Sequence, residues 1–373
     1  MTWLFWGAVA LISYTYFGYP AWLWLRGLLR PRPVHRASCL PFVSIVMVVR
    51  NEETVLEQKL RNLLELNYPE DLSEIIVVAD GCSDGSNHIL SHYAQQPRVH
   101  AMLNLLSRGK AAGLNDAAQF AHGDVIVFTD ARQLIEPEAV RLLGENFADP
   151  SVGCVSGELM LGNRQLGESS EGVGLYWKVE KTIRELESRS GSVIGATGAL
   201  YAVRRELLVP VPPETILDDV YIPMHVLRQG RRVVFDGRAR AWERPSDGTR
   251  LEFARKVRTL RGNYQLLQLA PWLLSGKNPA RFELVSHKLL RLIVPFALLA
   301  ALIASMFLHS PVYRAALAVQ IGFYALSLLA MVRPKMGVLS RMADAAFTFV
   351  ILNTAGVVAF AGFVTRRKVT WGR

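Results

Sequence analysis

Cysteine is scarce in this chain: its 373 residues include three, Cys39, Cys82 and Cys154. They have neither the spacing of a metal site nor an obvious pairing, which excludes a disulfide framework and fits a reducing compartment. Acidic residues are also outnumbered, 32 against 42 Lys and Arg, and the formal net charge is +10. Such an excess is compatible with nucleic acid, anionic lipid head groups or phosphorylated ligands. The sequence contains no internal repeat and no low-complexity region.

Charge is absent altogether from residues 3–25. This stretch matches the roughly 20 apolar residues that a bilayer requires, and Trp and Tyr crowd both of its ends, as they do at membrane interfaces. A signal peptide would begin with a basic region and end at a small-residue cleavage site, and neither is evident. We therefore expect residues 1–30 to form an uncleaved N-terminal transmembrane helix. Arg26, Arg30 and Arg32 follow it and predict that this side is cytosolic.

The C-terminal region, 280–365, is apolar again, which fits a mean hydropathy of +0.20. An amphipathic stretch from Arg281 to Arg291 predicts an interfacial helix, and two to three transmembrane segments follow it. Four crossings in all would place the basic stretches 333–341 and 366–373 on opposite sides, against the positive-inside rule. One segment could be re-entrant. The last one is the candidate, because the polar residue Asn353 lies in its middle. The apolar segments are 289–308, 312–332 and 343–364.

Residues 40–270 have the pattern of a water-exposed α/β domain. Short β-branched runs at 43–49, 74–79 and 124–129 predict buried parallel strands. Amphipathic or small-residue helices are expected between them, at 52–66 and 110–121. Strands that alternate with helices predict an open, mostly parallel, Rossmann-like sheet with helices on both faces.

Two of the predicted strands end in aspartate, Asp80 and Asp130. Ligands of open α/β sheets bind at the carboxyl ends of the strands, and carboxylate oxygens suit Mg²⁺ or Mn²⁺. Each Asp taken alone could simply cap the next helix or turn. Because both follow similar apolar runs, we favour a shared site that holds a cation and a ribose.

Three further groups of residues point to phosphate and proton chemistry. Gly109 and Lys110 begin a predicted helix, where backbone N–H groups and an ammonium would bind phosphate. Asp218 and Asp219 are adjacent in an apolar context, which raises one pKa and suits a general base. Within the basic region 228–261, Arg255 and Arg258 lie three apart on one helix face and could grip phosphate oxygens. The alternative for all of them is a capped or solvated helix end.

In this order, the motifs resemble those of the inverting family-2 glycosyltransferases with membrane segments, which include cellulose, hyaluronan and poly-N-acetylglucosamine synthases and ceramide glucosyltransferases. The resemblance covers 40–270 by motif and implies a cytosolic α/β domain of the GT-A fold plus transmembrane α-helices. The donor-side residues would be Val49 and Glu52 by the nucleotide base, Asp80, Lys110 on the phosphates, Asp130 as the metal ligand, and Arg255 and Arg258.

The acceptor-side residues that the resemblance implies come later in the chain. They are Gly195, Thr197 and Gly198 in a small-residue turn, Asp218 and the general base Asp219 in the Thr-Glu-Asp motif, and Glu243 at the end of a strand pair. Two positions depart from the family. Arg132 replaces the second Asp of the Asp-x-Asp motif, so that metal dependence is in question. Thr259 replaces the Trp of the Gln-x-x-Arg-Trp motif, which argues against polymer synthesis.

The resemblance implies transfer of a sugar, with inversion, from a nucleotide-diphosphate sugar such as a UDP-sugar to a lipid-linked or glycan acceptor at the cytosolic face of a bacterial inner membrane. A processive synthase that exports its product is the alternative. A non-catalytic membrane partner of a polysaccharide assembly complex is the alternative of another class, and an accessory subunit is left open. Nucleic-acid binding is not expected, because the basic residues adjoin membrane segments and lack interleaved aromatic side chains.

Overall fold

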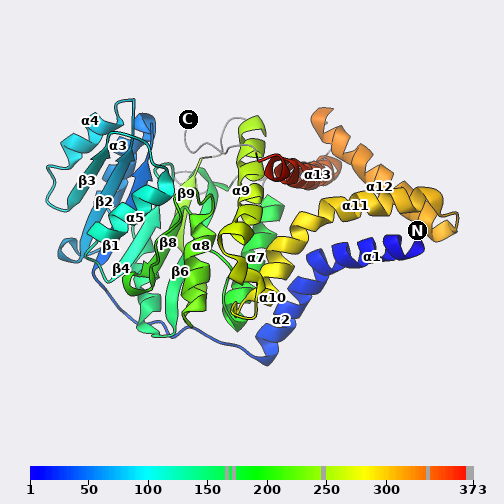
Figure 1. The fold of residues 1–373 in the computed structure, drawn as a ribbon, viewed down its shortest axis with the longest axis horizontal. Helices are drawn as coiled ribbons and strands as arrows, with labels where there is room; N and C mark the ends of the chain where they lie inside the picture. Colours follow the sequence, from blue (N-terminus) through cyan, green and yellow to red (C-terminus); the bar gives the residue numbers. More distant parts are fainter. Residues whose placement is uncertain (164–167, 170–173, 245–248, 333–336, 367–373) are drawn as a thin grey trace.

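A computed structural model describes residues 1–163, 168–169, 174–244, 249–332 and 337–366. Figure 1 shows two regions: a sheet covered by helices on both faces, and a set of long helices that extends away from one side of it. Within the described residues the sheet has nine strands. They are β1 (Val43–Val49), β2 (Ser73–Asp80), β3 (Val99–Asn104), β4 (Val125–Thr129), β5 (Leu134–Ile135), β6 (Val152–Asn163), β7 (Glu168–Ser169), β8 (Leu200–Arg204) and β9 (Arg232–Glu243).

The strand order is β3-β2-β1-β4-β8-β6-β9-β5, and β7 pairs with β6. The first four strands run parallel, whereas β8 runs antiparallel to both β4 and β6. β1, β2 and β4 are buried along their whole length, as strands covered on both faces must be. The expected Rossmann-like sheet is confirmed as a mixed sheet: β1, β2 and β4 of its parallel half correspond to the predicted runs, whereas β3 was not predicted.

The helices of this region cover the two faces of the sheet. Successive strand residues point to opposite faces: Val46 packs with α5 and α8, whereas Ile45 packs with α3, α4 and α6. α7 and α9 lie between the sheet and the long helices (Figure 1). The helices are α3 (Glu53–Leu64), α4 (Ser86–Tyr93), α5 (Lys110–Phe120), α6 (Ala139–Glu145), α7 (Gly174–Ser190), α8 (Asp218–Arg228) and α9 (Thr249–Leu269).

The stretch before Glu243 forms one long strand, β9, and not the expected strand pair. β9 pairs in parallel with β6 along most of its length, and the register shifts between Ser156 and Glu158. A bulge of this kind bends a strand without ending it. Because of this bend, the single strand β9 occupies the positions for which a pair of strands was expected.

The N-terminal segment is helical from residue 2 to residue 29, as α1 (Thr2–Ser13), a π-helical turn (Tyr14–Gly18) and α2 (Tyr19–Leu29). α1 lies beside α11, and the N-terminus is at the end farthest from the sheet (Figure 1). Among the described residues, three helices are long and apolar enough to cross a membrane, by length and composition alone: Arg281–Phe307, Pro311–Leu329 (α12) and Val338–Val364 (α13). The N-terminal segment, for which we expected a crossing, is not one of them.

The stretch Arg281–Arg291 does not form a separate interfacial helix. α10 (Arg281–Glu283), a π-helical turn (Leu284–Leu289) and α11 (Leu290–Phe307) follow one another directly. His287 lies between two glutamates of α7 and Arg291 pairs with one of them, whereas Arg281 is exposed. α13 also continues unbroken through Asn353, whose side chain donates to the Phe349 carbonyl one turn back.

Candidate active site

The carboxyl ends of the parallel strands form the floor of the site, and Asp80 lies there as predicted. Its side chain is fully buried. Its two oxygens accept hydrogen bonds from the Ser107 hydroxyl at 2.7 Å and from the backbone N–H groups of Arg108 and Gly109 at 2.7 and 2.9 Å. Asp80 therefore fixes the loop that precedes α5 and is not the exposed carboxylate expected at a strand end.

That loop delivers Lys110 to the centre of the site. Gly109 caps α5 with a φ of +91°, a conformation that glycine adopts without strain. Lys110 Nζ lies 2.9 Å from Asp130 Oδ1 and 3.4 Å from Asp218 Oδ2. Burial alone would lower the pKa of Lys110, but Asp130 and Asp218 hold that pKa above its usual range. The ammonium stays charged and joins the predicted donor side to the predicted acceptor side.

Asp218 and Asp219 begin α8, but their environments differ. Asp218 is buried beside Lys110, whereas Asp219 is partly exposed and its Oδ2 accepts a hydrogen bond from the Gly198 N–H at 3.2 Å. Burial, and after it the Asp218 carboxylate, raise the pKa of Asp219 to about 6. A carboxylate with this pKa is a competent proton acceptor near neutral pH.

The small-residue turn at 195–198 wraps around Asp219. The Ala196 N–H donates to the Asp219 carbonyl at 2.7 Å, and the Thr197 N–H donates to the Ser156 hydroxyl at 3.0 Å. A Cβ on Gly198 would lie 3.3 Å from Asp219 Oδ2 and 3.7 Å from Asp130 Oδ2, and one on Gly195 would meet Val220 at 3.1 Å. Glycine at 198 thus leaves open the space that both carboxylates face.

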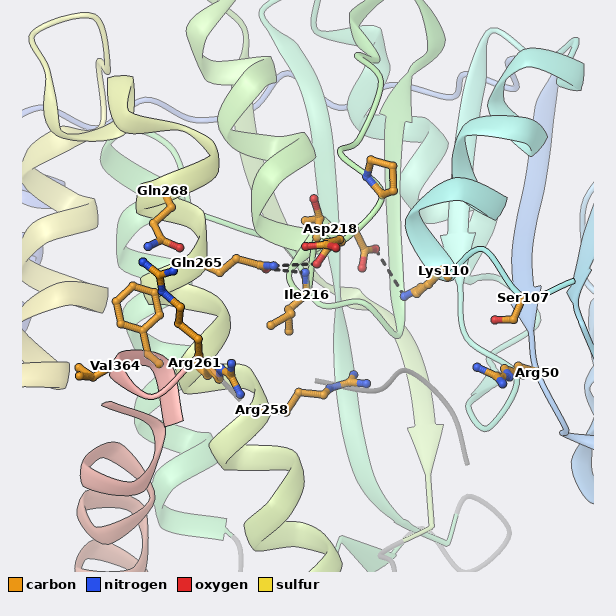
Figure 2. A pocket seen from close by; sticks show the side chains of 16 residues that line it. Arg50, Ser107, Lys110, Ile216, Asp218, Arg258, Arg261, Gln265, Gln268 and Val364 are labelled. Carbon is orange, nitrogen blue, oxygen red and sulfur yellow. Dashed lines mark hydrogen bonds and ion pairs between the residues drawn. The ribbon is translucent and has the colours of Figure 1, made fainter. Parts of the chain in front are cut away.

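A cavity of about 840 Å³ opens over this centre (Figure 2). Arg50 and Lys110 line one side, and Arg258, Arg261 and Gln265 of α9 line the opposite side. The end of the long apolar helix α13 also reaches it, through Phe363, Val364 and the following Arg366. Val49 is buried at the end of β1, immediately before Arg50.

Other predicted residues lie around a second cavity of about 690 Å³, next to the first. The guanidinium of Arg132 makes contacts of 2.9–3.0 Å with both carboxylate oxygens of Glu52. Glu243 accepts hydrogen bonds from Gln133 at 2.8 Å and from Arg255 at 3.1 Å. Arg255 and Arg258 are three residues apart, but Arg255 lines this second cavity and Arg258 the first, so that they do not grip one group together.

The site offers few donor atoms to a divalent cation. Asp130 is the one retained carboxylate of the Asp-x-Asp motif, and its Oδ1 is engaged by Lys110. In the part of the chain that the structure describes, no three His, Cys, Asp or Glu side chains converge as a metal site. Mg²⁺ at phosphate sites is held by one or two carboxylates together with the phosphates. The motif supplies one carboxylate here, and because Lys110 already engages it, the residues present fit such an ion poorly.

Lys59 is a feature of the site that was missed in the sequence. It is fully buried beneath β4, where Nζ donates to the Thr129 hydroxyl at 2.8 Å and to the Gln133 carbonyl at 2.5 Å. Burial lowers the pKa of Lys59 to about 7, against the opposing effect of Asp130. A signal was present: Lys59 falls on the buried stripe of α3, three residues after Leu56 and four before Leu63.

The arrangement is that of a GT-A glycosyltransferase: a parallel half-sheet that ends in carboxylates, a helix-start lysine and a candidate base facing them. Residues 44–209 match the family Glycosyl transferase family 2. Residues 44–209 therefore form a glycosyltransferase family 2 domain, and the predicted resemblance is confirmed for this part of the chain.

Three curated relatives illustrate the range of matches. The probable glycosyltransferase YdaM of Bacillus subtilis is 25% identical over 237 residues, 60% of this chain and 56% of that protein. The beta-monoglucosyldiacylglycerol synthase of Trichormus variabilis is 27% identical over 207 residues, 52% and 44%. The poly-beta-1,6-N-acetyl-D-glucosamine synthase of Staphylococcus epidermidis is 22% identical over 234 residues, 62% and 56%. The chain thus spans about half the length of the curated relatives it matches.

Among solved structures, the mannosyltransferase PcManGT from Pyrobaculum calidifontis, in complex with GDP-Man and Mn²⁺, superposes with a TM-score of 0.75. It is 24% identical, and the match covers 98% of this chain and 100% of PcManGT. At this identity the likeness shows the fold, and it confirms the expected GT-A fold together with the long helices that flank it.

Proposed function

We propose that this protein transfers a sugar from a nucleotide-diphosphate sugar to the hydroxyl of a lipid-linked or membrane-proximal acceptor, with inversion. The observation that carries the proposal is the shared cavity: phosphate-binding cations, a carboxylate beside a candidate base, and the end of an apolar helix all line one space or face it. GDP-Man is the donor bound in PcManGT. For this chain we favour UDP-sugars, as the resemblance implies, and we keep GDP-sugars in the test.

Asp219 is proposed as the general base. It takes the proton of the acceptor hydroxyl while the acceptor oxygen bonds to the anomeric carbon, and the bond from that carbon to the phosphate oxygen breaks. The bonding electrons leave with the nucleoside diphosphate, whose added negative charge Lys110 and Arg258 stabilise. Both side chains line the cavity, and stabilisation of charge that develops in the transition state is the largest catalytic term in many enzymes. Val49, Glu52, Asp80 and Asp130 complete the proposed donor side.

The acceptor proposal rests on α13. Its exposed apolar residues lead to Phe363 and Val364 at the cavity wall, so that a lipid tail could stay in the membrane while its head group reaches Asp219. On the same side lie Gly195, Thr197, Gly198 and Asp218. Thr259 has no aromatic ring on which an acceptor sugar could stack, and its hydroxyl donates a hydrogen bond to the Arg255 carbonyl. A single transfer is therefore favoured over a processive synthase.

The same cavity bears on membrane topology. Arg366 lines it together with Lys110, so that the C-terminal end of α13 belongs on the catalytic side. With crossings by residues 1–30, α11 and α12, the unbroken helix α13 would lie along the membrane surface with both ends on that side. Both basic stretches could then be cytosolic, although 333–336 and 367–373 lie outside the described residues. A single cysteine at 366 in a cysteine-free background should react with a membrane-impermeant maleimide only from the catalytic side.

The proposal is tested by nucleotide release from a panel of UDP- and GDP-sugars, with detergent-purified full-length protein and lipid-linked acceptors. Asp219→Asn should lower the rate by about 10²- to 10⁴-fold, the usual contribution of a general base. Asp71→Asn makes the same chemical change on an exposed side chain and should leave the rate unchanged. A full rate in Asp219→Asn would remove Asp219 from this role. Absence of both release and nucleotide binding would favour the non-catalytic membrane partner.

A further inference from the structure

The position that carries the second Asp of the Asp-x-Asp motif in the family is occupied here by a fixed cation. Arg132 is ion-paired with Glu52 through contacts of 2.9–3.0 Å. A guanidinium does not deprotonate in proteins and cannot ligate a metal. The position therefore contributes a positive charge where a metal ligand would contribute a negative one.

The first position of the motif also faces a side-chain cation. Lys110 Nζ lies 2.9 Å from Asp130 Oδ1 and bridges to Asp218 at 3.4 Å. Glu243, at the end of β9, is paired with Arg255 at 3.1 Å. Asp218 and Glu243 are thus each engaged by a protein cation and are not free to assist Asp130 in binding a metal.

The charges that line the main cavity also favour a diphosphate held by side-chain cations. Five cationic side chains line it, against the two carboxylates Glu214 and Asp218. Figure 2 shows four of these cations, Arg50, Lys110, Arg258 and Arg261, arranged around the space; the fifth is Arg366. An excess of fixed positive charge attracts a diphosphate and opposes a divalent cation at the same place.

We propose that the side-chain cations of the main cavity, with Lys110 at the centre, neutralise the donor diphosphate in this protein, and that donor binding needs no divalent cation because Arg132 stands where the motif would supply a metal-binding carboxylate. The inference rests on the proposed function, since it concerns how the same donor is held. It departs from the Mg²⁺ or Mn²⁺ predicted from the sequence and from the Mn²⁺ present in PcManGT.

The test uses calorimetric binding of UDP and of GDP to the purified full-length protein, first in excess EDTA and then with Mn²⁺. We expect the better ligand of the two to bind equally in both conditions, within about twofold. Tightening by Mn²⁺ of about tenfold or more, the change of one strong contact to a charged group, would overturn the inference and leave the proposed function standing. Absence of binding in every condition would overturn the proposed function, and the inference with it.

A pair of variants sharpens the result. Arg132→Asp restores the two-carboxylate motif, and we expect Mn²⁺ to tighten its nucleotide binding by about tenfold or more, with Mn²⁺ uptake visible by electron paramagnetic resonance. Arg132→Asn removes the cation without adding a carboxylate and should stay insensitive to Mn²⁺. Equal Mn²⁺ responses in wild type and Arg132→Asp would contradict the role assigned to Arg132.

Discussion

Two clusters of buried charge differ in what surrounds them. The Lys110 cluster, made of Lys110, Asp130, Asp218 and Asp219, opens on the main cavity: the Lys110 and Asp130 side chains are 19% and 39% exposed. The His287 cluster joins the long helices to α7, and its side chains are almost completely enclosed, with His287 at 1% and Glu187 at 0%. It comprises Tyr19, Glu180, Glu187, His287 and Arg291.

The contacts of the two clusters explain the contrast. His287 is bonded on both ring nitrogens, to Glu187 at 2.8 Å and to Glu180 at 3.3 Å, and the Tyr19 hydroxyl donates to Glu187 at 2.6 Å. None of these residues lines either cavity. In the Lys110 cluster, the Asp219 side chain is only partly buried and has a raised pKa. Buried charge that opens on a cavity is available for chemistry, whereas enclosed charge holds elements together.

The largest effect is expected at Lys110. Lys110→Met removes the cation that faces the cavity and should lower kcat/KM for nucleotide release by about 10²- to 10³-fold, as loss of one preorganised electrostatic group does. Lys181→Met removes a lysine from another ion pair, with Glu158 at 2.7 Å, away from both cavities. Equal losses in the two variants would show that the Lys110 cluster is no different from an ordinary ion pair.

The opposite behaviour is expected at His287. His287→Leu leaves Glu180 and Glu187 without their shared partner and should cost about 3 kcal/mol of unfolding free energy, because broken buried pairs leave unpaired charge. The rate per folded molecule should not change. Thermal unfolding in detergent, read beside the nucleotide-release rate, separates the two quantities, and His88→Leu on the exposed face of α4 serves as the control. A lost rate with unchanged stability would move His287 into the catalytic site.

The sequence contained the local features of the site but not the contacts between distant segments. The strands at 43–49 and 125–129, and Lys110 at a helix start, follow from β-branched runs and from glycine at a cap. The partners of Lys59 lie 70 and 74 residues away, and those of His287 lie 100 and 107 away. No periodicity in the sequence encodes such separations, so the contacts of Lys59 and of His287 become visible only in the folded chain.

The pH dependence of the rate should report Asp219. A base with a pKa of about 6 must be ionised to accept a proton, so that kcat/KM should rise with pH through about 6 and be roughly tenfold below its plateau at pH 5. Arg132→Asn keeps Asp219 and should retain the profile. A profile that is flat between pH 5 and pH 8 would show that another group accepts the proton.

Stability should depend on the same ionisation with the opposite sense. The folded-state pKa of Asp219 lies above 3.8, the ordinary pKa of an aspartate, so the folded protein binds this proton more tightly than the unfolded chain does. The favourable contribution is present below about pH 4 and is lost as pH rises through about 6. The stability of Asp219→Asn relative to wild type should therefore increase from pH 4 to pH 7 in thermal unfolding.

The smallest expected effect is a difference in nucleotide binding between variants of two arginines of α9. Arg258 lines the main cavity and Arg255 the second one, where it pairs with Glu243. Both side chains are exposed, so that solvent screens them and Arg258→Gln should weaken UDP or GDP binding only about threefold to tenfold, less at high salt. Arg255→Gln, one helical turn earlier, should change binding by less than about twofold because its partner is a protein carboxylate. Equal weakening by both would mean that the diphosphate spans the two cavities, and Arg132 would then contact it directly.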